Sequence, residues 1–210
     1  MKLLLIVLIS LSYPSVDNFK LQNGDLIFQE SCSGDISNAI KDVTSSTDKY
    51  NFTHVGMVYI KENDSIYVIE ATQPEVKITP LSKFLYPADE KECYPQSVVG
   101  RLKEKYRHCI PQAIKEGMSL IGKKYDYGYN LNNDKYYCSE LIYHILLKAN
   151  NGNPIFHLNK MTFKSKGTKK FLPEWVNYFK ELNTPIPEGK PGINPGAMSK
   201  ADVIDIIHHY

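Results

Sequence analysis

The chain has 210 residues, of which 42% are hydrophobic and 23% are charged, with a formal net charge of +2. These values are close to those of average globular proteins, so they argue against a mainly disordered, collagen-like or coiled-coil chain. The length suits one domain with an ordinary hydrophobic core. Arg101 and Arg107 are the only arginines. Because the charge balance is also mild, the composition does not favour nucleic-acid binding.

Residues 1–15 are typical of a secretory signal peptide. Lys2 precedes an apolar run at residues 3–9, and small residues follow, so cleavage is expected after Ser12 or Ser15. The run is shorter than the ~20 residues that a transmembrane helix needs. A buried N-terminal strand or helix is the alternative interpretation. We therefore expect an exported protein, periplasmic or secreted, without a transmembrane anchor.

The mature segment, residues 16–210, is predicted to form a single α+β domain in which an antiparallel sheet packs against helices. Residues 171–210 are expected to be a peripheral C-terminal extension, closed by a helix in which Ser199 and Asp202 fit a capping box. Alternating and β-branched runs predict the strands, and apolar residues at helical spacing predict the helices. In chain order the predicted elements are a turn and strand within 20–29, a helix at 34–46, strands at 52–60, 65–71 and 76–78, a helical turn at 80–85, a strand at 97–102, helices at 111–121, 136–148 and 171–182, an irregular segment at 183–196, and a helix at 199–207.

The four cysteines are Cys32, Cys93, Cys109 and Cys138. An even number of cysteines in an exported chain is compatible with disulfides, and their pairing cannot be read from their spacing. If one thiol stays free for chemistry, at most one disulfide remains, and Cys93–Cys109 is a candidate. Buried free thiols are the more ordinary state and the favoured interpretation. The spacing contains no CxxC motif, and no metal site is predicted.

Cys138 lies at the start of the strongest predicted helix, just after the turn-forming residues 132–134. Unpaired backbone N–H groups and the helix dipole stabilise an anion at a helix N-terminus. A thiol in such a position forms the nucleophilic thiolate more readily, and the same N–H groups can stabilise an oxyanion. The alternative is a small buried side chain that only packs the helix, which is the commoner role unless a base lies nearby.

His54 and Glu70 could supply that base and its partner. Alternation places His54 on one strand face with Phe52, and Glu70 on one face of the following strand. If the short polar connection forms a hairpin, His54 lies either directly opposite Glu70 or, with a register shifted by two residues, diagonal to it. A carboxylate among apolar residues is costly without a partner, which an imidazole can provide. A strand histidine bonded to the backbone is the alternative.

Several segments, in their order and spacing, resemble the YiiX/YebB-like branch of the circularly permuted papain-like hydrolases, within the NlpC-type superfamily. Unpermuted relatives carry the cysteine helix first, whereas here histidine precedes glutamate and cysteine. The resemblance covers about residues 20–150 of the 210. The segments that carry it are Asn23–Phe28, His54–Val58, Val68–Ala71, Gly122–Asp126 and Tyr137–Leu141.

The resemblance implies a permuted papain-like fold and cysteine-dependent hydrolysis of an amide or peptide bond. It makes Cys138 the nucleophile, His54 the base and Glu70 the group that orients the base. Tyr125 and Tyr137 would line the substrate site, with aromatic packing as their alternative role. Neither a metal nor an organic cofactor is required for this chemistry.

Two other functions remain open. A lipid-directed thiol acyltransferase or phospholipase could use the same residues, and an exposed apolar groove would favour it. A non-catalytic binding module is disfavoured by the intact set Cys138, His54 and Glu70. Residues 160–170 contain lysines but no acid and are interpreted as a solvated loop rather than a contact for anionic polymers. The expected partner is a peptide or amide substrate, with cell-wall peptide and a lipid acyl group as candidates, and no nucleic acid.

Overall fold

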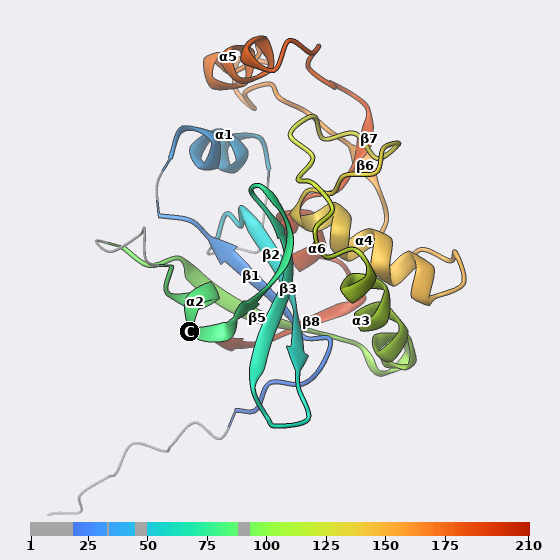
Figure 1. Ribbon diagram of the computed structural model, residues 1–210. Coiled ribbons are helices and arrows are strands. Elements are labelled where there is room, and N and C mark those ends of the chain that lie inside the picture. The colour runs from blue at the N-terminus through green and yellow to red at the C-terminus, as the bar shows by residue number, and fades with distance from the viewer. Residues whose placement is uncertain (1–18, 33, 45–49, 88–92) are drawn as a thin grey trace, which may run out of the picture.

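The described residues form an antiparallel sheet of six strands in the order β4-β3-β2-β1-β5-β8 (Figure 1). The computed structural model describes residues 19–32, 34–44, 50–87 and 93–210, so the predicted signal peptide at 1–15 lies outside the described residues. The strands of the sheet are β1 (Leu26–Glu30), β2 (His54–Ile60), β3 (Ile66–Thr72), β4 (Glu75–Pro80), β5 (Gln96–Leu102) and β8 (Ile204–His209).

Helices cover both faces of this sheet and one of its ends. The longer helices α3 and α4 pack on one face, α2 packs on the other, and α1 and α5 lie beyond the end of the sheet (Figure 1). The helical elements are α1 (Asp35–Val43), α2 (Leu81–Leu85), the 3₁₀ helix η1 (Glu104–Cys109), α3 (Ile110–Ser119), α4 (Cys138–Ala149), α5 (Pro173–Glu181) and α6 (Pro195–Ser199). A small ribbon of β6 (Asn159–Lys160) and β7 (Pro191–Gly192) connects the α4 and α5 regions.

The alternation of side chains along the strands divides the sheet into two apolar layers. On β2, Val55 and Met57 join the core with α4, whereas Val58 joins the cluster under α2. Burial of apolar side chains on both faces is the main favourable term for such a sheet, at roughly 25 cal/mol per Å² removed from water. These clusters hold the central strands between the two helical layers, so the ends of the strands are rigid supports for side chains.

The register between β2 and β3 is the shifted alternative. Ile60 pairs with Ile66 and Met57 with Ile69. In the same register the next residues, Gly56 and Glu70, lie opposite each other, so Glu70 is diagonal to His54. A Cβ atom at Gly56 would lie 2.3 Å from Cγ1 of Val68, so no larger side chain fits there. Val68 and the Phe84 ring fill the space over Gly56, and the Phe84 ring also packs near the ring of His54.

Alternation predicted that Phe52 and His54 share one strand face, but they do not. The strand begins at His54, and Phe52 packs in the core cluster together with Val55 and Met57. Strand alternation does not extend beyond the first paired residue, because the preceding backbone is free to turn its side chain to the other side.

The C-terminal residues are not a peripheral extension, and residues 199–207 are not a helix. Strand β8 pairs with β5 along the edge of the sheet, with Leu102 opposite Ile204. The hydroxyl of Ser199 donates to the carbonyl of Gly196 within α6, so it does not cap a following helix. Pairing with the free edge of β5 satisfies backbone groups of this segment that a short terminal helix would leave to water.

The cysteine pairing also differs from the expectation. Cys32 and Cys93 form a disulfide, whereas Cys109 and Cys138 are free and buried. The antiparallel register of β1 and β5 pairs Glu30 with Gln96, so Cys32 and Cys93 follow and precede neighbouring strand ends. The proposed Cys93–Cys109 bridge is therefore wrong, and buried free thiols are found at only two of the four positions. Within the part of the chain that the structure describes, no helix is both long and apolar enough to span a membrane.

Candidate active site

Cys138 is the first residue of α4 and faces the start of β2. Tyr137 precedes it with extended backbone, and the Glu140 side chain accepts a hydrogen bond from the Tyr137 N–H at 3.2 Å, which holds the first turn. The apolar residues Leu141 and Ile145 fix the helix against the sheet. The Cys138 side chain is 6% exposed, and its Sγ lies 3.9 Å from the carbonyl oxygen of Thr53.

His54 joins Cys138 to Glu70. Its Nε2 lies 2.7 Å from a carboxylate oxygen of Glu70, and Cys138 lies close enough to the ring to raise the pKa of His54. Glu70 is 5% exposed, and its other oxygen accepts a hydrogen bond from the hydroxyl of Thr79 on β4. The three residues predicted as nucleophile, base and orienting group thus lie in one continuous chain of contacts.

The electrostatics of this chain favour a charged imidazole. Burial on its own lowers the pKa of His54, but the hydrogen bonds with Cys138 and Glu70 and the negative charges of these groups outweigh it and raise the pKa to about 10. Burial on its own raises the pKa of Glu70, but the hydrogen bond and charge of His54 reverse this and lower it. At neutral pH the arrangement therefore favours imidazolium between two acidic groups.

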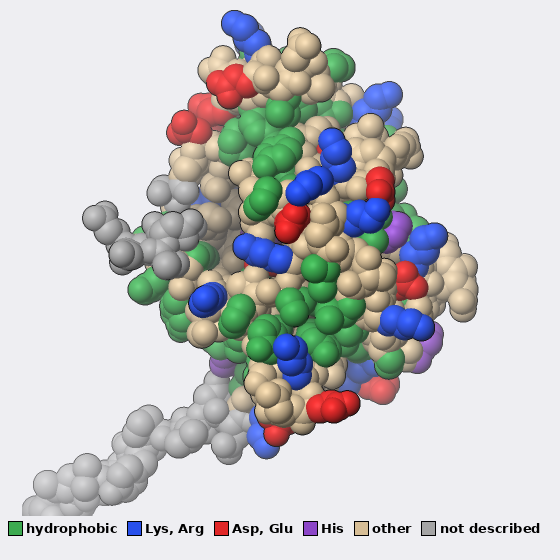
Figure 2. All heavy atoms as spheres, in the orientation of Figure 1, with side chains coloured by type: hydrophobic (Ala, Val, Ile, Leu, Met, Phe, Trp, Pro, Cys, Tyr) green, Lys and Arg blue, Asp and Glu red, His purple; other side chains and the backbone are tan. Residues whose placement is uncertain are grey.

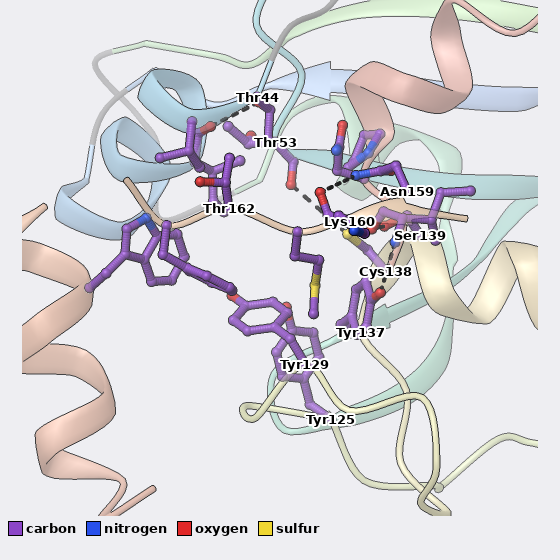
Figure 3. A pocket seen from close by; sticks show the side chains of 18 residues that line it. Thr44, Thr53, Tyr125, Tyr129, Tyr137, Cys138, Ser139, Asn159, Lys160 and Thr162 are labelled. Atoms are coloured by element: carbon purple, nitrogen blue, oxygen red, sulfur yellow. Dashed lines mark hydrogen bonds between the residues drawn. The ribbon is translucent and has the colours of Figure 1, made fainter. Parts of the chain in front are cut away.

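A cavity of about 110 Å³ opens beside Cys138. In Figure 3, Cys138 and Tyr137 lie on one side of it and Tyr125 and Tyr129 along another. The other walls come from α1, the β6 segment, α5 and the residues before α6. The lining residues are Ile40, Val43, Thr44, Thr53, Tyr125, Tyr129, Tyr137, Cys138, Ser139, Asn159, Lys160, Met161, Thr162, Phe163, Trp175, Ile193, Asn194 and Pro195.

Hydrogen bonds hold the tyrosines of this wall in place. The Tyr137 hydroxyl accepts from the Ile193 N–H at 3.2 Å. The Tyr178 hydroxyl donates to the backbone carbonyl of Tyr127 at 3.0 Å, and the Tyr178 ring packs against the Tyr129 ring with centroids 6.3 Å apart. Burial raises the pKa values of Tyr125 and Tyr137, so both phenols are neutral at physiological pH. Tyr125 and Tyr137 thus line the cavity as neutral hydrogen-bonding groups.

Two buried carboxyl groups lie behind the nucleophile without contacting the cavity. Burial raises the pKa of Glu140 to about 8, and the negative charges of Asp126 and Cys138 contribute to the increase. Asp126 accepts hydrogen bonds from the N–H groups of Gly128 and Asn130, which shapes the loop that carries Tyr129. Glu140 thus holds the first turn of α4, and Asp126 holds the loop beside the cavity.

Sequence reasoning missed Thr79 and Trp175. Alternation along β4 could have indicated Thr79, because Glu70 pairs with Lys77 and the side chain two residues further lies on the same face. Trp175 lies far along the chain in a segment without a recognised motif, and only the packing of α5 against α1 brings it to the cavity.

Two lysines of the segment at 160–170 make contacts with other parts of the chain. The Lys166 ammonium donates to the carbonyl of Thr44 at 2.6 Å, and Lys164 pairs with Glu188 at 3.6 Å. On the face drawn in Figure 2, acidic side chains lie among the Lys and Arg side chains.

Comparison with known proteins relates this arrangement to one family. Residues 20–208 match the family model described as permuted papain-like amidase enzyme, YaeF/YiiX, C92 family. The Escherichia coli (strain K12) protein described as "Uncharacterized protein YiiX" is 32% identical over 146 residues, which are 70% of this chain and 67% of the relative.

A solved structure gives the same result for the fold. The crystal structure described as metalloprotein YiiX from Escherichia coli O157:H7 has a TM-score of 0.72 and 25% identity, covering 91% of this chain and 99% of that chain. Among the residues described here, no three His, Cys, Asp or Glu side chains gather as metal ligands. The family match extends beyond residue 150 to the C-terminal strand, in agreement with the pairing of β8 in the sheet. The chain belongs to the permuted papain-like amidase family YaeF/YiiX.

Proposed function

We propose that this chain is a cysteine amidase that cleaves an amide or peptide bond through a thioacyl intermediate. The observation that carries the proposal is the position of His54, which contacts both Cys138 and the buried carboxylate of Glu70. A nucleophile, a base and a group that orients the base are the components of covalent acyl transfer. The family to which the chain belongs supports the same reaction class.

In the first half of the reaction the Cys138 thiolate attacks the carbonyl carbon of the substrate. The N–H groups of the first turn of α4 have no partner within the helix and can hold the resulting oxyanion. When the carbon–nitrogen bond breaks, imidazolium of His54 gives its proton to the departing amine. Glu70 and Thr79 hold the imidazole in position during this transfer.

In the second half water replaces the amine. Neutral His54 takes a proton from water, and the water oxygen attacks the thioester carbonyl carbon. The carbon–sulfur bond then breaks, the acid is released, and the thiolate is restored beside imidazolium. Each residue returns to its starting state, and the net change is addition of one water across the amide bond.

We further propose that the enzyme acts outside the cytoplasm, on cell-wall or other extracellular peptides. The signal-like sequence at residues 1–15 supports export. The Cys32–Cys93 disulfide supports it independently, because disulfides persist in oxidising compartments. Expression of the full chain in a Gram-negative host, followed by fractionation and N-terminal sequencing, tests this point. Cytoplasmic protein that keeps Met1 would contradict it.

The catalytic proposal is tested with purified mature protein on short peptides, including wall-derived ones. Cleavage should disappear in Cys138→Ala, and intact mass spectrometry of a rapidly quenched reaction should detect the acyl group on Cys138. Cys109→Ala is the matched control, because it removes the other free thiol. Cleavage that survives in Cys138→Ala would reject the proposed nucleophile.

A lipid-directed acyltransferase or phospholipase is the second candidate, and the apolar walls of the cavity favour it. Its test uses the same protein on phospholipid vesicles, with Cys138→Ala as the blank. Release of fatty acid that depends on Cys138, without cleavage of any amide, would place this function first.

A further inference from the structure

The cavity beside Cys138 has walls of a different origin from the proposed catalytic residues. Met161, Phe163 and Trp175 belong to the segment between α4 and the end of α5, and Ile40 and Val43 belong to α1. None of these five makes the hydrogen bonds that join His54 to its partners. They are therefore free to decide which substrate is accepted without altering the chemistry.

The size of the cavity limits what can fill it. An engineered protein cavity of about 150 Å³ binds benzene. The cavity here is smaller, at about 110 Å³, so it suits a branched or unbranched group of roughly four carbons. A leucine or methionine side chain has this size. A long fatty acyl chain would leave most of its length outside.

The residues that line the cavity determine which charge a bound side chain can carry. The lining is mainly aliphatic and aromatic, and among the described lining residues there is no aspartate or glutamate. Lys160 is the one lysine in the lining, and it has no ion-pair partner among the described residues. A cationic side chain would therefore lose its hydration, find no carboxylate partner and meet the positive charge of Lys160.

Trp175 belongs to the apolar part of the wall. It is 2% exposed, and its indole N–H is the buried side-chain group without a hydrogen-bond partner in the described part of the chain. The indole nitrogen has less than 1 Å² of accessible surface, so it does not face the open space of the cavity. Trp175 therefore contributes the apolar surface of its ring to the cavity.

We propose that this cavity is a specificity subsite that binds one compact, neutral apolar side chain next to the scissile amide and rejects cationic side chains. The inference rests on the proposed amidase function and names its substrate class. Side chains that are shorter than leucine leave the cavity partly empty, and larger aromatic ones exceed it. Each missing or extra methylene in such a pocket changes selectivity roughly tenfold or more.

Trp175 is the only tryptophan of the chain, so its fluorescence reports occupancy of the cavity without any need for turnover. The test titrates the mature Cys138→Ala protein with N-acetyl amides of leucine, alanine, phenylalanine and lysine, with calorimetry as a second readout. The leucine amide should give a saturable change in emission, and its Kd should be at least tenfold lower than those of the alanine and lysine amides. Equal affinities, tighter binding of the lysine amide, or no binding of the leucine amide in either readout would overturn the subsite.

Two variants relate the selectivity to the walls. Met161→Ala enlarges the cavity and should shift the preference from leucine towards phenylalanine, and Lys160→Gln should reduce the penalty against lysine. Val176→Ala is the matched control, because Val176 follows Trp175 on α5 but is 43% exposed and does not line the cavity. An unchanged order of affinities in Met161→Ala would also contradict the proposal.

A parallel cleavage assay of the protein with intact Cys138 separates this inference from the proposed function. Cys138-dependent cleavage with the same rate for every side chain would reject the subsite and keep the amidase. Selective binding of the leucine amide without cleavage of any amide would keep the subsite and reject the amidase.

Discussion

The starts of α3 and α4 each place a free, buried cysteine beside a histidine. At the start of α3, the Cys109 Sγ lies 3.3 Å from Nε2 of the neighbouring His108. At the start of α4, Cys138 lies beside His54, which is distant in the sequence and whose pKa it raises. Both thiols therefore meet the simple description of a cysteine at a helix N-terminus with a nearby imidazole.

The two regions differ in whether a carboxylate pairs with the histidine and in whether a cavity opens beside the sulfur. Glu70 holds His54, whereas among the described residues no carboxylate pairs with the exposed His108. Burial raises the pKa of the Cys109 thiol, and its side chain is 1% exposed in the core. Cys138 instead lines a cavity. A helix start and a histidine are thus insufficient, and the buried carboxylate and the open space make the difference.

Removal of each thiol in turn should give the largest difference between the two regions. Cys138→Ala should lower kcat/KM by roughly 10³-fold or more, because it removes the group that forms the covalent intermediate. Cys109→Ala should leave kcat/KM within about twofold and lower the free energy of unfolding by ~1 kcal/mol, as a small core truncation does. Steady-state kinetics and urea unfolding measure both. Similar loss of activity in the two variants would remove the distinction.

Glu70→Gln tests the role of the carboxylate that contacts His54. The amide keeps the size of the side chain but removes the charge that stabilises imidazolium, so kcat should fall roughly 10²-fold or more with a smaller change in KM. Near-native unfolding free energy and circular dichroism serve as the control. A variant with normal kcat would show that Glu70 only satisfies a structural hydrogen bond.

Thiol labelling sharpens the comparison without a substrate. At pH 7, iodoacetamide should modify Cys138 about tenfold or more faster than Cys109, because only Cys138 combines an imidazolium partner with access to a cavity. Mass-spectrometric mapping of the two peptides over time gives the rates. His54→Ala should bring the two rates closer together, and equal rates in the unchanged protein would contradict the comparison.

The pH dependence follows from the raised pKa of His54. Imidazolium is needed to protonate the leaving amine, so kcat/KM should stay high through neutral pH and fall as the pH rises through about 10. In Glu70→Gln the same limb should move to lower pH, because a hydrogen bond and a negative charge that raise this pKa are removed. The raised pKa of His54 also stabilises the folded protein. This contribution is complete below the ordinary imidazole pKa of 6.5 and is lost as the pH rises to the folded-state pKa of about 10. A limb near the ordinary value in the unchanged enzyme would exclude the ion pair.

The paired cysteines should have the smallest effect on catalysis. Replacing Cys32 and Cys93 together by serine should lower the free energy of unfolding by about 2–4 kcal/mol, since the disulfide closes a long loop. Well below the melting temperature, kcat/KM should remain within about twofold, because neither residue lines the cavity or contacts the proposed catalytic residues. Thermal unfolding with and without reductant measures the first effect. A large loss of activity at a temperature where the variant is folded would connect this region to the site.

The local pattern of the sequence was sufficient for the elements that carry His54, Glu70 and Cys138. Period-two alternation on β2 and β3 and the apolar stripe of α4 are properties of neighbouring residues, so they can be read directly. The short connection between the strands limited the register to a few possibilities, and the diagonal one was among them. The family resemblance then named the same three residues.

Other features were decided only by tertiary structure. The pairing of Cys32 with Cys93 depends on which strands are neighbours in the sheet, and the register of β1 with β5 settles it. The last segment forms a strand rather than a helix because the edge of β5 offers its backbone hydrogen bonds. The cavity is built from segments distant in sequence, including α1 and α5, whose packing leaves no local pattern. Local periodicity determines which elements form, whereas long-range packing determines what they enclose.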